Sequence, residues 1–135
     1  MIYESTIQYT TTKNKGVEVL KSEKYILENV SLFCDVEERM LKTFIGYKDV
    51  DVTAIRRSKI REIANNRNSE DDLIWIAEVE DVFLTEEGEE KRTKYKIAFY
   101  SKTFDSAKAY ITEYTKQGYN LGIVSLKCTN FVEIL

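Results

Sequence analysis

Histidine is absent from this chain of 135 residues, and its absence excludes several kinds of chemistry. Histidine is the commonest general acid–base residue and a frequent metal ligand near neutral pH. Without it, the chain can form no Ser-His-Asp or Cys-His catalytic centre and no ordinary zinc hydrolase site. The five glycines are dispersed and form no phosphate-binding loop. We therefore expect a protein that is not an enzyme and that carries no cofactor or metal.

Cysteine is scarce as well, with Cys34 and Cys128 as its two occurrences. In a reducing compartment the expected state of two such residues is a pair of unpaired, partly buried thiols. Two cysteines without a histidine do not make an ordinary zinc site. A disulfide or a metal role is the less favoured alternative.

Long apolar runs are missing too, since none approaches the roughly 18 residues that a membrane helix needs. The N-terminus lacks the basic and apolar regions of a signal peptide. We expect no membrane partner and a cytoplasmic location, which is the host cytoplasm if a phage encodes the protein.

Neither sign of charge is in strong excess, because the chain has 20 basic and 23 acidic residues, for a net charge of −3. Residues 1–70 carry +1 and residues 71–135 carry −4. General nucleic-acid binding usually goes with a strong basic excess, so net charge gives it no support. A local basic patch remains open.

Alternating polar and apolar residues are what the sequence does contain. Residues 75–83 and 94–100 alternate on either side of a charged turn at 85–90, which is typical of a β-hairpin. Residues 3–10 and 24–30 repeat this pattern around a turn that holds Gly16. The chain therefore indicates two hairpins of similar design.

A helix and a third strand follow each predicted hairpin. Asp35 and Asp105 are the expected helix caps. The apolar face of the first helix is Val36, Met40, Leu41 and Phe44, and that of the second is Ala107, Tyr110, Ile111 and Tyr114. The expected strands are residues 2–11, 23–31, 50–55, 74–84, 93–101 and 119–127.

The two halves correspond at nearly constant spacing, which predicts a duplication. Tyr25 and Tyr95 lie 70 residues apart, whereas Glu62 and Glu133 lie 71 apart. We expect an α+β fold built by tandem duplication of a ββαβ unit, with antiparallel-rich sheets and two helices packed on one side. The expected boundaries are 1–63, a polar linker at 64–72, and 73–135. One larger sheet and a pseudo-symmetric sandwich both fit this pattern.

The sharpest basic cluster contains four cations in six residues, Arg56, Arg57, Lys59 and Arg61. Such a cluster can contact phosphates. It can equally be a solvated strand end that is blunted against pairing. The basic residues at 91–94 adjoin acidic residues at 86–90, and charges of opposite sign in one turn mostly neutralise each other.

Aromatic residues on the strands leave two interpretations open. Rings on an exposed sheet face beside cations stack single-stranded bases. Tyrosines at alternate strand positions are more often half-buried under a helix. The candidate rings are Tyr3, Tyr9, Tyr25, Trp75 and Tyr95, of which Tyr25 and Tyr95 join the basic cluster as candidate nucleic-acid-binding residues.

Several segments together resemble an uncharacterised family, domain of unknown function 4494, of small proteins from gut anaerobic bacteria and their phages. The segments are Trp75 at the head of a strand, the charged turn 88–93, the strand 25–31, and the strand end 52–57. Residues 33–37 depart from the alanine- and glutamate-rich helix start of that family. The resemblance implies no catalytic residues and suggests a phage or mobile element as the setting.

Three functions follow as hypotheses. The first is an accessory binding protein of a phage or mobile element that acts by occupying a macromolecular partner. The second is a single-stranded nucleic-acid-binding protein that uses the sheet tyrosines and the 56–61 cluster. The third is a structural or assembly component in which an exposed hairpin edge pairs with another copy, giving a homo-oligomer.

Overall fold

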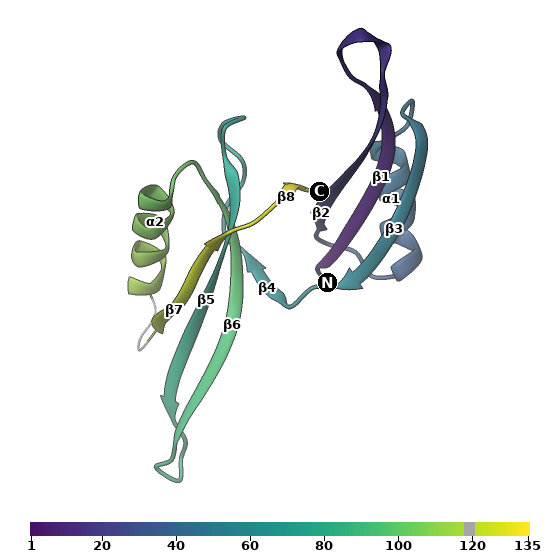
Figure 1. Ribbon diagram of the computed structural model, residues 1–135. Helices are drawn as coiled ribbons and strands as arrows, with labels where there is room; N and C mark the ends of the chain where they lie inside the picture. The colour runs from purple at the N-terminus through teal and green to yellow at the C-terminus, as the bar shows by residue number, and fades with distance from the viewer. Residues whose placement is uncertain (118–120) are drawn as a thin grey trace. The chain divides into compact units, whose positions relative to one another are not determined.

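The computed structural model describes residues 1–117 and 121–135. The chain forms two compact units (Figure 1). Unit 1 contains Met1–Ser58 and Phe131–Leu135, and unit 2 contains Lys59–Asn130. Each unit has one helix and a mixed sheet of four strands, so the expected α+β class and the duplication are confirmed.

Unit 1 is built around the hairpin of β1 (Tyr3–Thr12) and β2 (Glu18–Leu27), with the short 3₁₀ turn η1 (Asn14–Gly16) between them. Helix α1 (Phe33–Thr43) and strand β3 (Lys48–Arg57) follow, and β8 (Phe131–Ile134) completes the sheet. The strand order is β3-β1-β2-β8. Strands β1, β2 and β3 are antiparallel neighbours, whereas β8 runs parallel to β2.

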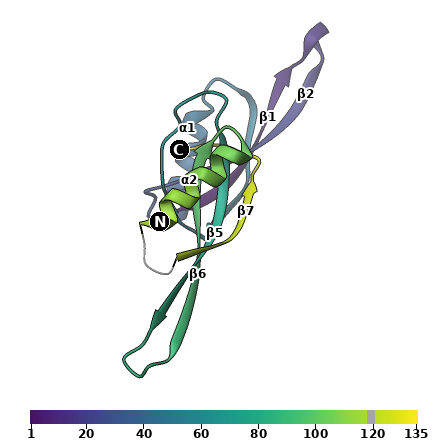
Figure 2. The ribbon, with the colours of Figure 1, turned by 90° about the vertical axis from the view of Figure 1, so that its left-hand side faces the viewer.

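Unit 2 repeats this plan with the hairpin of β5 (Leu73–Leu84) and β6 (Glu90–Ser101). Helix α2 (Phe104–Lys116) lies across the sheet (Figure 2), and β7 (Leu121–Cys128) pairs with β5. Strand β4 (Ile60–Ile63) runs parallel to β6, which gives the order β4-β6-β5-β7. The expected strand at 119–127 begins partly outside the described residues.

The last strand of each repeat belongs to the sheet of the other repeat. Strand β4 follows β3 in the first repeat but pairs with β6, and β8 follows β7 in the second repeat but pairs with β2. The compact units therefore differ from the boundaries 1–63, 64–72 and 73–135 that the sequence repeat indicates. Residues 60–63 and 131–134, which match each other in sequence, both form strands.

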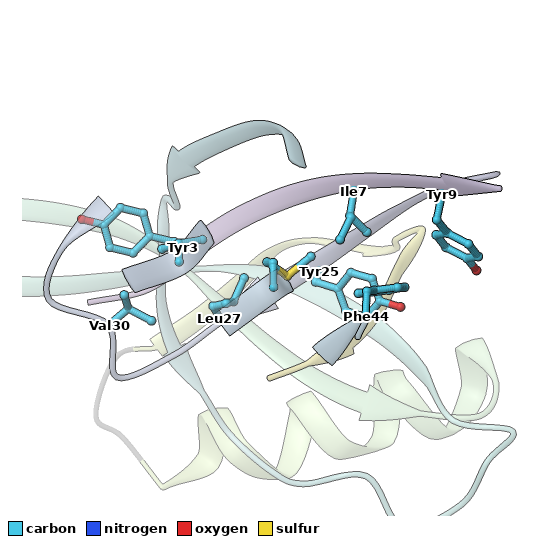
Figure 3. Close-up of a cluster of buried hydrophobic side chains, with 9 residues drawn as sticks. Tyr3, Ile7, Tyr9, Tyr25, Leu27, Val30 and Phe44 are labelled. Atoms are coloured by element: carbon cyan, nitrogen blue, oxygen red, sulfur yellow. The ribbon is translucent and has the colours of Figure 1, made fainter. Parts of the chain in front are cut away.

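A buried cluster under each helix explains the alternation of the strands. In unit 1, Ile7, Tyr25 and Phe44 gather with their neighbours in one cluster (Figure 3). In unit 2, Phe99 stacks on Tyr110 of α2, with ring centroids 4.9 Å apart. The apolar side chains of one strand face point toward the helix because successive side chains alternate between the two faces.

Several local expectations need correction. Asp35 and Asp105 do not cap the helices, because each lies in the first turn. Helix α2 begins after Thr103, whose extended backbone lets its hydroxyl accept from the backbone N–H of Ser106 in a capping box. Leu41 is 42% exposed and lies outside the core.

The second strand begins five residues earlier than expected, at Glu18, because β1 and β2 stay paired as a ribbon as far as Thr12 and Glu18. The end of this ribbon has no buried face, and the adjacent Val19 and Leu20 fall on opposite faces, so the sequence shows no alternation there. The thiols of Cys34 and Cys128 are free, as expected, but exposed rather than partly buried.

The segment 64–72 forms no helix or strand, yet it is held firmly. The side chain of Asn65 accepts from the backbone N–H of Tyr100 at 2.7 Å and donates to its carbonyl at 3.1 Å. Asp72 accepts from the backbone N–H groups of Asn68 and Ser69 at 2.9 and 3.1 Å. These bonds make the segment a folded loop of unit 2.

Helices α1 and α2 are short and amphipathic. Within residues 1–117 and 121–135, no helix is long and apolar enough to cross a membrane.

Candidate functional site

Strand β6 presents two lysines on the sheet face opposite α2. Ile97 and Phe99 pack in the cluster that includes Ala107 of α2. Because side chains alternate along a strand, Lys94 and Lys96 project from the other face.

These lysines line a hollow of about 180 Å³ on unit 2. We call it the Lys94 hollow, and its lining residues are Lys59, Glu78, Lys94, Tyr95 and Lys96. Glu78 lies directly opposite Lys96 in the β5–β6 pairing, and Lys59 immediately precedes β4.

A β-bulge places a further cation, Arg61, beside the Tyr95 ring on the α2 side of β6. Ile60 pairs with Lys96 and Glu62 with Ile97, so Arg61 is an extra residue in β4. A bulge of this kind re-aims a side chain. The guanidinium carbon of Arg61 lies 4.7 Å from the ring centroid of Tyr95, which is a cation–π contact.

The charges of the Lys94 hollow are unbalanced. Three lysines line the hollow with one carboxylate, that of Glu78. Glu80 lies directly opposite Lys94 in the β5–β6 pairing, and its carboxylate is 3.6 Å from Arg92. In the described part of the chain, none of the three ammonium groups lies within 4.0 Å of a carboxylate oxygen. Like charges that converge without a partner repel one another, so the hollow favours a bound anion.

The predicted basic cluster is divided between the two units. Arg56 and Arg57 end β3 in unit 1, whereas Lys59 and Arg61 belong to unit 2. Within unit 2 the fold brings Lys59, Arg61 and Tyr95 together.

Arg56 has its own surroundings in unit 1. Its Nε and Nη2 atoms donate to one carboxylate oxygen of Glu4 at 3.3 and 2.8 Å. A hollow of about 220 Å³ lies beside this pair. We call it the Lys24 hollow, and it is lined by Glu4, Ser5, Thr6, Lys24, Ala54, Arg56 and Phe131.

Most of the candidate aromatic rings are buried rather than displayed. Tyr3, Tyr9, Tyr25 and Trp75 are each 6–7% exposed. The Trp75 indole N–H donates to the carbonyl of Ser101 at 2.9 Å, which fixes the ring in the core. Tyr95 is half-buried and borders the Lys94 hollow, but its side chain packs against the cluster under α2, on the face opposite Lys94 and Lys96.

The hydroxyls of two buried tyrosines are satisfied by one glutamate. Tyr9 and Tyr25 both donate to the carboxylate of Glu23, the latter at 2.7 Å. Burial and then the Glu23 hydrogen bond raise the pKa of Tyr9 to about 12, and the same causes raise the pKa of Tyr25 further. In unit 2, burial and Glu62 likewise raise the pKa of Tyr114. These phenols remain neutral hydrogen-bond donors at neutral pH.

Another hollow, of about 510 Å³, lies near the tip of the β5–β6 hairpin. Two of its lining residues, Glu80 and Glu90, have a carboxylate oxygen 3.6 and 3.7 Å from the guanidinium of Arg92. Two carboxylates thus share one guanidinium, so this hollow has an excess of negative charge, whereas the Lys94 hollow has an excess of positive charge. Among the described residues, no three His, Cys, Asp or Glu side chains gather where they could hold a metal ion.

Sequence reasoning overlooked Glu78, Lys96 and Lys24, and it interpreted Lys94 as part of a charge-neutralised turn. The alternation Lys94-Tyr95-Lys96 was the available signal, because it places two cations on one face of a strand. The cluster 56–61 drew attention through proximity in sequence, whereas the hollows join residues from different strands.

Comparison with known proteins agrees with the resemblance of the segments. No curated protein and no solved structure matches this chain. One family model matches residues 1–135, the whole sequence. The chain therefore belongs to the family described as domain of unknown function (DUF4494).

Proposed function

We propose that this protein is a small non-enzymatic binding protein, an accessory protein of a phage or mobile element that acts in the cytoplasm by occupying a macromolecular partner. The partner we propose is single-stranded nucleic acid, held by its phosphates at the Lys94 hollow. The observation that carries the proposal is the convergence of Lys59, Lys94 and Lys96 without a carboxylate within ion-pair distance in the described chain.

The chemistry of the hollow suits phosphate. The lysine ammonium is a compact point charge with three donors and is a common phosphate ligand. Lys94 and Lys96 lie two residues apart on one face of an extended strand, which is about 7 Å. That spacing is similar to the distance between successive phosphates of an extended single strand.

Arg61 offers a surface for a base at the edge of the sheet, next to the hollow. It lies against the Tyr95 ring, which packs on the α2 side of β6, so this surface is on the face opposite Lys94 and Lys96. Single-stranded nucleic acids stack bases on aromatic rings and on arginine planes. The buried Tyr3, Tyr9 and Tyr25 do not take part, so the contact we propose is made by phosphates and one edge of the sheet rather than by a tyrosine-lined face.

A salt series of fluorescence anisotropy measurements tests this proposal, with labelled single-stranded DNA, single-stranded RNA and duplex DNA as probes. The test variant is Lys94→Gln/Lys96→Gln, and the matched control is Lys91→Gln/Lys102→Gln, which removes two exposed lysines outside the hollow. For single strands, each lost phosphate contact lowers the slope of log K against log salt by about 0.7. We expect a loss of about 1.4 in the test variant and a smaller loss in the control.

Two outcomes contradict the proposal. One is the absence of binding at low salt to any of the three probes. The other is an equal loss in the test and control variants, which would mean that only overall charge matters.

A further inference from the structure

The Lys24 hollow of unit 1 is the duplicated counterpart of the Lys94 hollow. Tyr3 pairs with Leu27 and Trp75 with Phe99, so the two hairpins correspond at a spacing of 72 residues and Lys24 matches Lys96. Each lysine lies in the strand that receives the exchanged parallel strand, β2 or β6. Lys24 pairs with Phe131 at the start of β8, and Lys96 pairs with Ile60 at the start of β4. Both hollows thus lie where an exchanged strand begins.

The hydrogen-bond donors of the Lys24 hollow are only partly used. Arginine has five N–H donors. The Nε and Nη2 atoms of Arg56 bond to Glu4, while its side chain stays 76% exposed and keeps other donors available. Lys24 is exposed and forms no ion pair within the described residues. Two cations therefore face the single carboxylate of Glu4.

An aromatic ring completes the arrangement. Phe131 is half-buried and lines the hollow together with Lys24 and Arg56. A ring beside cations is the combination that holds a nucleotide of a single strand, with the phosphate on the cations and the base against the ring.

We infer that the Lys24 hollow is a second nucleotide-binding site, in which Lys24 and Arg56 contact a phosphate of single-stranded nucleic acid and Phe131 packs against a base. This inference rests on the proposed function and extends it from one unit to both. The Glu4 carboxylate holds Arg56 in place and weakens the binding of anions, so the site has moderate affinity by itself.

Anisotropy with a labelled oligodeoxythymidine strand tests the second site in the full chain. Lys24→Gln is expected to lower the salt slope by about 0.7 and the affinity about two- to fivefold at low salt. The matched control is Lys21→Gln, which removes the same charge from the same strand, where Lys21 lies 3.7 Å from Glu23. Phe131→Leu keeps an apolar side chain and is expected to weaken binding without changing the slope. Glu4→Gln is expected to tighten binding about two- to fivefold, because it removes the competing carboxylate.

The outcomes separate this inference from the proposed function. Equal behaviour of Lys24→Gln and Lys21→Gln overturns the second site. If Lys94→Gln/Lys96→Gln still loses binding in that case, the proposed function stands alone. A loss in Lys24→Gln together with normal binding by the double variant would instead support unit 1 and refute the Lys94 hollow. If neither variant loses binding, both proposals fail.

Discussion

Deletion of residues 131–135 should weaken unit 1, although these residues follow unit 2 in the chain. The backbone N–H of Leu135 donates to Ile26 at 2.7 Å, and the backbone N–H of Glu28 donates to Leu135 at 3.2 Å. The Leu135 side chain also packs against the core cluster of unit 1. These two net hydrogen bonds contribute about 2 kcal/mol, and partial burial of a leucine contributes about 1 kcal/mol. The deletion also removes the pairing of β8 with β2, so the expected loss is at least about 3 kcal/mol.

Native-state hydrogen exchange followed by mass spectrometry measures where this loss falls. Amide protection in β1 and β2 should fall roughly a hundredfold, which corresponds to about 3 kcal/mol. Protection in β5 and β6 should change little, and the fluorescence of Trp75, the only tryptophan, should report an intact unit 2. Leu84→Ala, at a site 74% exposed on the tip of the second hairpin, is the control and should leave both units unchanged.

A fall of protection in β5 and β6, with β1 and β2 unaffected, would refute this reasoning. That result would mean that the repeats 1–63 and 73–135 fold as separate units and that β8 contributes to its own repeat.

Three further predictions concern buried polar contacts. Asn65→Ala should destabilise the protein by about 1–3 kcal/mol in urea unfolding, because the Tyr100 backbone loses both of its hydrogen bonds to this side chain. Asn65→Asp keeps the acceptor and should therefore lose less stability. Equal losses in the two variants would contradict the role of both bonds. Asp72→Ala should cost a similar amount, since two backbone amides of its loop lose their acceptor, and an unchanged urea midpoint would contradict this. The pKa of Tyr9 is raised to about 12, so its contribution to stability is complete below about pH 10 and is lost as the pH rises toward 12. In a phenolate absorbance titration, Glu23→Gln should bring part of the tyrosine ionisation to lower pH, and an unshifted curve would contradict the role of Glu23.

Local pattern was sufficient to predict most of the secondary structure. Alternation located both hairpins because one face of each strand is buried under a helix, and helical spacing located Val36, Met40 and Ile111 in the cores. The outer end of the β1–β2 hairpin, as far as the pair Thr12 and Glu18, was not predicted. It has no buried face, so its sequence does not alternate. The helix start at Thr103 was not predicted, because Asp105 nearby is also a favoured capping residue. Only the backbone geometry shows that Thr103 is the N-cap.

The candidate site was predictable only in part. The sequence drew attention to Arg56, Lys59, Arg61 and Tyr95, and three of these meet within unit 2. Lys94 was interpreted as part of a neutralised turn, since its neighbours 86–90 are acidic. Its position on the helix-free face of β6, beside Lys59, depends on pairing between β4 and β6, which are separated by some 30 residues.

The sequence by itself determined the α+β class, the duplication and the residues that fill each core, because burial imposes a period of two on strands and of 3.6 on helices. Tertiary structure alone decided that β4 and β8 are exchanged between the repeats. Four-residue strands of similar sequence carry no mark of which sheet they complete, so hydrogen bonding to β6 and β2 in the folded chain makes that choice. The same choice sets where the two hollows form, because each lies at the start of an exchanged strand.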